Sequence, residues 1–265
     1  TITMAVVDAS SDNNFDDVAN QTVTATTVDN DTAGFTLSTT TASVAETATT
    51  ATFTVVLDAQ PDTDVVISVT SADAGEATVS SGTLTFTNGN WDSAQTITVT
   101  GVDDDIIDGS VNTTITLAIN DGSSHDQYDD VANQTVTATT TDDDTAGFTL
   151  GAISGTVAET ATTATFTVVL NAEPDSNVVI SVTSADTGEA TVSAGTLTFT
   201  TGNWDTPQTI TVTGVNDALA DGSQNTTITM AVVDASSDNN FDDVANQTVT
   251  ATTVDNDTAG FTLST

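Results

Sequence analysis

Residues 50–57 read TATFTVVL, and within them Phe53, Val55 and Leu57 alternate with Thr52 and Thr54. An apolar period of two is typical of a β-strand with one buried face, whereas an amphipathic helix has a period of 3.6. Thr suits the solvent face of a sheet because its β-branched side chain favours extended backbone. The stretch therefore predicts a half-buried strand.

Further strands are expected along the chain. Alternating or apolar runs occur at 65–70, 96–100, 114–119 and 135–139. Turn residues separate the runs, at 60–62, 88–90 and 108–110. Roughly seven short strands in about 110 residues is typical of an immunoglobulin-like β-sandwich. A disordered, glycosylated Thr-rich stalk is the alternative; the strict alternation and the low proline content, 3 residues in all, argue against it.

The chain repeats itself. Residues 1–39 return unchanged as 227–265, and half of that offset also aligns the chain, so that Phe35 matches Phe148 and Trp91 matches Trp204, 113 positions further on. The unit is therefore a 113-residue repeat in two alternating versions. We expect two whole sandwiches, at 33–145 and 146–258, between the last strands of a preceding repeat at 1–32 and the first strand of a following one at 259–265. We interpret the sequence as a window on a longer array.

The charge is extreme. The chain contains no Lys or Arg and 38 acidic residues, for a formal net charge of −38. Nucleic acid is excluded as a partner because nothing neutralises phosphates, and an anionic membrane surface is excluded for the same reason. No segment is apolar enough to insert into a membrane. The expected counter-ions are metal cations, and oxygen-only ligands favour Ca²⁺ or Mg²⁺.

Acidic residues fall in particular connections of the predicted sandwich. In a seven-strand sandwich, every second connection lies at the same tip. These are the connections that follow the first, third and fifth strands, and the end of the seventh strand lies there too. Nine carboxylates occur in these four stretches: Glu46, Asp73, Asp103, Asp104, Asp105, Asp108, Asp142, Asp143 and Asp144. Clustered carboxylates raise one another's pKa and destabilise a fold unless a divalent cation binds. Solvated acidic loops are the alternative.

Four motifs in the first repeat support a family resemblance. The segments VAET at 44–47, GTLTF at 82–86, GVDDDIIDG at 101–109 and the closing DDD at 142–144 resemble Calx-beta domains, the calcium-binding sandwiches of sodium–calcium exchangers that also occur as tandem repeats in large bacterial surface proteins and adhesins. The resemblance covers the whole repeat. It implies Ca²⁺ as the cofactor and the nine carboxylates as its ligands.

The second repeat keeps fewer of these acids. Asn216, Ala218 and Asn256 replace three of them. The corresponding ligands implied by the resemblance are Glu159, Asp186, Asp217, Asp221, Asp255 and Asp257, and in the N-terminal segment the counterparts of the closing acids are Asp29 and Asp31. We expect the first repeat to bind calcium more tightly, because affinity follows ligand charge.

The sequence contains no residue pattern that indicates catalysis. Cysteine is absent and the one histidine, His125, is not repeated, so no nucleophile–base pair can be proposed. We expect His125 to be an exposed loop residue, and Trp91 and Trp204 to plug one end of each core. The connection before the last strand carries further acids at the opposite tip: Asp129, Asp130, Asp242 and Asp243. Two interpretations of these acids remain, solvated side chains or part of an interdomain site.

The expected function is structural. Identical domains in series add length, and calcium at their junctions removes hinge freedom. The sequence thus favours a non-enzymatic extender of an extracellular, cell-surface adhesin or filament, whose partners are neighbouring repeats of the same chain and identical chains. The alternatives are a glycan- or ice-binding adhesive module using Thr-x-Thr rows, and a subunit that assembles laterally into a sheath or matrix.

Overall fold

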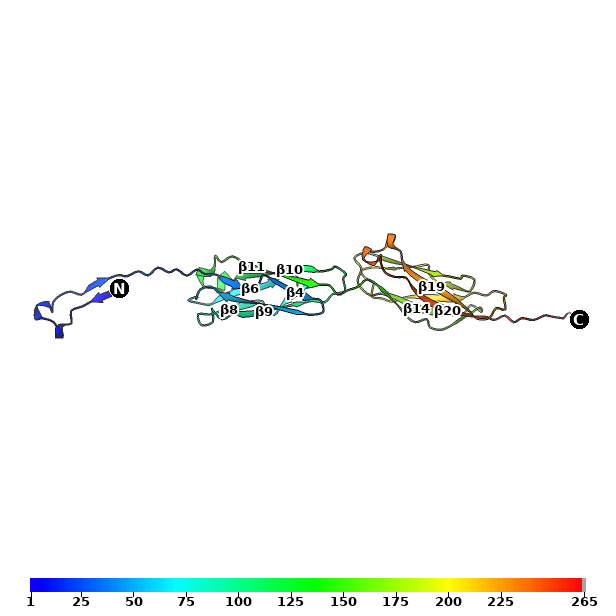
Figure 1. The fold of residues 1–265 in the computed structure, drawn as a ribbon, viewed down its shortest axis with the longest axis horizontal. Coiled ribbons are helices and arrows are strands. Elements are labelled where there is room, and N and C mark those ends of the chain that lie inside the picture. The colour runs from blue at the N-terminus through cyan, green and yellow to red at the C-terminus, as the bar shows by residue number, and fades with distance from the viewer. Residues whose placement is uncertain (264–265) are drawn as a thin grey trace.

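The computed structural model describes residues 1–263 and is an elongated molecule made of β-strands (Figure 1). Two β-sandwiches lie end to end along its long axis, with a short hairpin at the N-terminal end and an extended segment at the C-terminal end. The expectation of an all-β tandem array is confirmed. None of the helices in the described part of the chain is long and apolar enough to cross a membrane.

The first sandwich consists of a four-stranded and a five-stranded sheet. The four-stranded sheet has the order β3 (Phe35–Leu37), β5 (Thr50–Leu57), β9 (Gln95–Gly101), β7 (Ala77–Val79). The five-stranded sheet has the order β4 (Thr41–Ala45), β11 (Gln134–Thr141), β10 (Val111–Ile119), β6 (Val65–Ser71), β8 (Thr83–Phe86). All neighbours pair antiparallel except β4 and β11, which are parallel.

The second sandwich repeats this topology. Its four-stranded sheet has the order β12 (Phe148–Leu150), β14 (Thr163–Leu170), β18 (Gln208–Gly214), β16 (Ala190–Val192). Its five-stranded sheet has the order β13 (Val157–Ala158), β20 (Gln247–Val254), β19 (Gln224–Val232), β15 (Val178–Ser184), β17 (Thr196–Phe199). Strand β13 is shorter than its counterpart β4, and Gly155 precedes it, a residue type that weakens strands.

The core of each sandwich is built by the period-two pattern. In β5 and β9, Phe53 faces Ile97 in register and both side chains are buried, whereas the neighbouring pair of Thr52 and Thr98 faces outward. The same alternation buries one face of every long strand. The residues expected to form the core are all at most 3% exposed: Phe53, Leu57, Ile97, Val99, Ile115 and Leu117.

The connection between the last two strands of each sandwich contains short 3₁₀ turns. They span Asp121–Ser123 and Asp126–Tyr128 in the first sandwich, and Asp234–Ser236 and Asn239–Phe241 in the second. Tyr128 and Phe241 point from these turns into the two cores. The Tyr128 hydroxyl donates a 2.5 Å hydrogen bond to the carbonyl of Ala59, so that the connection is fixed to the sandwich.

The N-terminal segment shows that burial of the apolar strand residues depends on the complete sandwich. β1 (Ile2–Met4) and β2 (Gln21–Val23) form a two-stranded sheet in which Ile2 and Met4 are 61% and 58% exposed. The identical residues Ile228 and Met230 are fully buried in the second sandwich. At the other end, residues 259–263 form no strand, and positions 264–265 of the expected first strand of a following repeat lie outside the described residues.

One tip of the first sandwich points toward the second sandwich (Figure 1). Four segments meet there: the turn after β4, the connection from β6 to β7, the connection from β9 to β10, and the chain leaving β11. Gly101 is required at this tip, because a Cβ there would lie 2.2 Å from the carbonyl oxygen of Ala45. This close approach brings the end of β9 against the turn that carries Glu46.

Candidate metal centre

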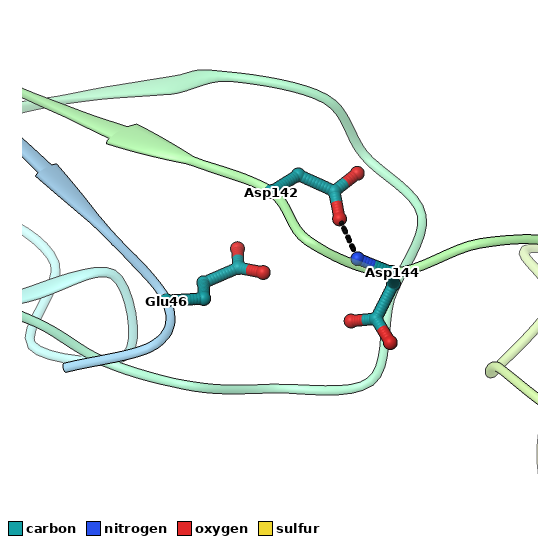
Figure 2. A group of neighbouring side chains, drawn as sticks. All are labelled: Glu46, Asp142 and Asp144. Carbon is teal, nitrogen blue, oxygen red and sulfur yellow. Dashed lines mark hydrogen bonds between the residues drawn. The ribbon is translucent and has the colours of Figure 1, made fainter.

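Three carboxylates meet at the tip between the two sandwiches (Figure 2). Glu46 follows β4, and Asp142 and Asp144 follow β11; one oxygen from each lies within 4.8 Å of the others. Glu46 is only 1% exposed, and the two aspartates are half-buried. Segments 96 residues apart in the sequence therefore converge because β4 and β11 are parallel neighbours that end at the same edge.

Backbone amides hold these carboxylates in place. The Asp144 N–H donates to Asp142 Oδ1 at 2.7 Å, as Figure 2 shows, and the Asp143 N–H donates to Glu46 Oε2 at 3.3 Å. The Gly109 N–H donates to Asp142 Oδ2 at 2.8 Å, which ties the connection from β9 to β10 to the end of β11. Gly109 has a φ of +74°, a conformation that favours glycine.

Glu76 is a second buried acid at this tip, and the sequence interpretation missed it. It precedes β7, is 8% exposed, and its Oε2 is buried without a hydrogen-bond partner among the described residues. Its carbonyl oxygen accepts hydrogen bonds from the Val102 N–H at 2.9 Å and from Thr140 Oγ1 at 3.1 Å. The sequence held one indication of this acid: a single Glu occurs just before an apolar strand in both repeats, as Glu76 and as Glu189.

The pKa values at this tip reflect burial among like charges. Burial, followed by the charges of Asp104, Asp142 and Asp108, raises the pKa of Glu46 from 4.5 to about 7. Burial and neighbouring aspartates, Asp142 foremost, raise the pKa of Asp144 to about 6.

The pKa values of Glu76 and Asp108 are raised as well, in both cases first by loss of hydration, which is only partial at Asp108, and then by other carboxylates. One of the carboxylates acting on Asp108 is Asp175 of the second sandwich. Each of these groups keeps its proton to a higher pH than a free carboxyl group does, so the tip resists carrying its full charge.

The other acids predicted for the first repeat lie at the same tip but outside the three-carboxylate group. Asp104 is half-buried and its Oδ1 accepts from the Ile106 N–H at 2.8 Å. Asp73 is exposed and its Oδ1 accepts from the Gly75 N–H at 2.9 Å. The remaining predicted acids have exposed side chains: Asp103, Asp105, Asp108 and Asp143.

The second sandwich has a related group in which Glu159, Asp217 and Asp257 each place an oxygen within 4.8 Å of the others. Glu159 is 3% exposed, and Asp257 Oδ2 is buried with no hydrogen-bond partner in residues 1–263. Asp257 also receives support from Asp255, whose Oδ1 accepts the Asp257 N–H at 2.6 Å. Burial and nearby acids raise the pKa of Glu189, the counterpart of Glu76.

Amides replace carboxylates at the rim of this second group. Asn256 Nδ2 donates to Asn216 Oδ1 at 2.9 Å, where the first repeat has Asp143 and Asp103. This hydrogen bond joins two neutral side chains at a place where two charges would repel.

Asp186 and Asp221 of the second repeat are exposed. Asp29 and Asp31 are exposed in the extended N-terminal segment and belong to neither group of carboxylates in the described residues. The segment 1–32 carries no counterpart of Glu46, so the acids there have no buried partner.

Two single residues expected from the sequence can be located. His125 was expected to be exposed, and that was wrong: its side chain is 17% exposed, because it lies in the 3₁₀ connection with Nε2 3.9 Å from Asp62 Oδ2. Trp91 and Trp204 are partly buried against the first and second cores respectively.

The donor set of both groups fits a hard cation. All available ligand atoms are carboxylate or carbonyl oxygens, and the buried oxygens of Glu76 and Asp257 have no proton donor in the described part of the chain. Ca²⁺ accepts six to eight oxygens in a tolerant geometry, whereas Mg²⁺ demands a near-ideal octahedron. A group of three carboxylates from two segments, with further acids nearby, therefore fits Ca²⁺ better than Mg²⁺.

Both sandwiches carry a buried glutamate beside acids that follow their last strand, an arrangement that could hold a cation. The chain belongs to the Calx-beta family, whose model matches residues 29–145 and 141–257. The family expected from the sequence is thereby confirmed, and Calx-beta domains are calcium-binding domains. No curated protein sequence matches the chain.

Several solved structures are similar in fold. The tandem domains CBD12 from CALX1.2 are 17% identical, with 75% of this chain and 79% of that chain covered and a TM-score of 0.33. The apo form of the Calx CBD1 domain is 19% identical, covering 43% of this chain and 99% of that one, with a TM-score of 0.33. Domains 4–9 of the surface layer protein SbsC are 20% identical, covering 83% and 31%, with a TM-score of 0.27.

Proposed function

We propose that this chain is a non-enzymatic extender segment of an extracellular surface protein or filament, and that Ca²⁺ bound at its interdomain tips stiffens it. The observation that carries the proposal is the buried carboxylate group of Glu46, Asp142 and Asp144, located where one sandwich meets the next. Burial of like charges at a junction is costly unless a cation neutralises them.

In the first sandwich, Glu46, Asp142 and Asp144 would hold the ion, with Glu76 and Asp104 as further ligands from two other segments. A bound Ca²⁺ would be coordinated by carboxylates from four segments of the fold at once. Extracellular calcium modules of this kind bind at roughly 10⁻⁴ to 10⁻³ M. The site would thus be filled outside a cell, where calcium is millimolar.

Stiffening follows from the position of these ligands. Asp142 and Asp144 lie on the segment that leaves the first sandwich and enters β12 after Thr145, so binding would fix the linker itself. Asp104 lies on the connection from β9 to β10, which also contacts the second sandwich. Without calcium, repulsion among these acids would loosen both connections, and the array would change from a rod to a flexible string.

Small-angle scattering of the 265-residue chain with calcium and with chelator tests the proposal. We expect a longer maximum dimension and a narrower shape distribution with calcium, together with a higher melting temperature, because an ion bound only by the folded state stabilises it. The matched control is Glu46→Gln with Asp144→Asn, which should respond to calcium much less. Equal dimensions and equal melting temperatures of the natural chain in both conditions would reject calcium stiffening.

One observation favours a second function, binding to a flat ordered surface such as ice. On the outer face of the first sandwich, the threonines of β5 pair in register with those of β9: Thr50 with Thr100, Thr52 with Thr98 and Thr54 with Thr96. The second sandwich repeats this grid in β14 and β18. Spacings of about 4.8 Å between strands and about 6.7 Å along them make a regular hydroxyl array.

Ice recrystallisation in the presence of the chain tests this second function. Inhibition that persists in chelator and is lost in Thr52→Lys would support it. The twist of the sheet reduces the fit between the threonine array and a flat surface. If the chain does not inhibit recrystallisation, the extender remains the proposed function.

A further inference from the structure

The connection from β9 to β10 of the first sandwich reaches across the junction. Ile106 forms an isolated parallel β-bridge with Glu173, which lies between β14 and β15 of the second sandwich. The Glu173 N–H donates to the Asp105 carbonyl at 2.7 Å. Asn240 Nδ2 of the second sandwich donates to the Ile107 carbonyl at 3.1 Å. Three consecutive residues of one sandwich thus make main-chain contacts with two loops of the next.

The side chain of Ile107 enters the second sandwich. It packs against that sandwich's core cluster, as do Ala146 and Val244. It lines a crevice of about 610 Å³ at the junction together with Phe148. Ile107 is half-buried. Asp144, a proposed calcium ligand, lines the same crevice. The Ile107 side chain itself makes an apolar contact, which gives interdomain affinity without a charge.

The two repeat versions differ at this position. In the second sandwich the corresponding residue is Ala220, and Leu219 stands in the place of Ile106. On the receiving side, the second sandwich presents Asn240 where the first has Gln127, whereas the apolar residues beneath are the same in both. Each version therefore presents a different tip to its successor.

We propose that Ile107 is an interdomain plug that docks the first version of the repeat onto the second, and that the reverse junction lacks this plug. In an array where the two versions alternate, every second junction is plugged and the junctions between them depend on the linker and on bound cations alone. The array is then a series of docked pairs of sandwiches, with about twice the rigid length of one domain.

The rigidity of the junction can be measured by electron–electron double resonance on the whole chain. The chain contains no cysteine, so Thr85→Cys and Thr198→Cys on exposed positions of β8 and β17 provide one spin label on each sandwich. The plug is removed by Ile107→Ala, which copies the residue found naturally at position 220. The matched control is Leu219→Ala, which removes a similar side chain from the tip that docks onto no whole sandwich in this chain.

In calcium, the unchanged chain should give a narrow distance distribution, and Ile107→Ala should give a broad one. Removing three carbons from a half-buried side chain should raise the ratio of undocked to docked molecules about tenfold, equivalent to about 1.4 kcal/mol. Leu219→Ala should leave the distribution unchanged. Equal widths for the unchanged chain and Ile107→Ala would overturn the plug.

Calorimetric titration with Ca²⁺ separates this inference from the proposed function. Ile107→Ala keeps every carboxylate, so its calcium uptake should remain within about twofold of the unchanged chain. If the unchanged chain takes up no calcium but Ile107→Ala still broadens the distances, the plug stands and calcium stiffening fails. If Ile107→Ala abolishes calcium uptake, Ile107 shapes the metal site itself and the plug as a separate device is wrong.

Discussion

Neutralising Glu46 should stabilise the metal-free protein, and calcium should remove most of that advantage. Glu46→Gln keeps the size of the side chain and an oxygen that can accept the Asp143 N–H, but it removes a charge that is buried among other acids. The variant is therefore more stable than the natural chain when cations are absent, and calcium should bring the two stabilities close together.

The magnitude follows from the pKa of Glu46, which burial and neighbouring aspartates raise from 4.5 to about 7. A raised pKa in the folded state means that the contribution to stability is fully present below the unfolded value of 4.5 and is lost as the pH rises through about 7. At about 1.4 kcal/mol for each pH unit of displacement, the ionised group costs on the order of 3 kcal/mol at about pH 8.5. Glu46→Gln should recover on the order of 2 to 3 kcal/mol of this in chelator.

Calcium offsets most of this difference. At about 5 mM calcium and a dissociation constant of ~10⁻⁴ M, binding stabilises the folded state by about 2 kcal/mol. The natural chain gains this stabilisation and Glu46→Gln largely loses it. Stability of the metal-free natural chain should also fall between about pH 5 and pH 8, and calcium should flatten that dependence.

Urea unfolding followed by tryptophan fluorescence measures the effect. In a Trp204→Phe background, Trp91 reports on the first sandwich alone. The control is Asp92→Asn, an exposed acid away from the tip, which should shift stability by less than about 0.5 kcal/mol. If Glu46→Gln is less stable than the natural chain in chelator at about pH 8.5, the carboxylate is not strained by its neighbours and the reasoning fails.

Three further predictions concern packing, ligand charge and net charge. Gly101→Ala should lower the free energy of unfolding by about 1–3 kcal/mol or more, because the added Cβ meets the Ala45 backbone; Gly82→Ala, where a Cβ has ordinary contacts only, is its control in the same urea assay. Asn216→Asp combined with Asn256→Asp should tighten calcium binding by the second sandwich about tenfold, measured by calorimetry, because two charges replace the amide pair; unchanged affinity would place these positions outside the site. Raising NaCl to about 1 M in chelator should raise the melting temperature, because salt screens the repulsion of 38 acidic residues that have no basic partner; a fall would show that self-repulsion is not the dominant cost.

The amino-acid sequence by itself determined the fold class and its repetition. Phe53, Val55 and Leu57 alternate with polar residues, and side chains spaced by two lie on the same face only in a β-strand. The all-β fold therefore follows from local geometry. The 113-residue self-similarity requires each unit to fold in the same way. The meeting of the acidic connections at one tip also follows, because strand order alone decides which loops share an end.

The tertiary structure decided which side chains meet. Glu46, Asp142 and Asp144 approach within 4.8 Å, whereas Asp143, between the two aspartates, stays exposed, because neighbouring residues of an extended segment point in opposite directions. Glu76 was missed because one Glu in an apolar stretch carries no pattern, and its burial depends on the packing of β7 against β9 and β11. The docking of Ile107 is likewise invisible in the sequence, since it depends on how one folded domain meets the next.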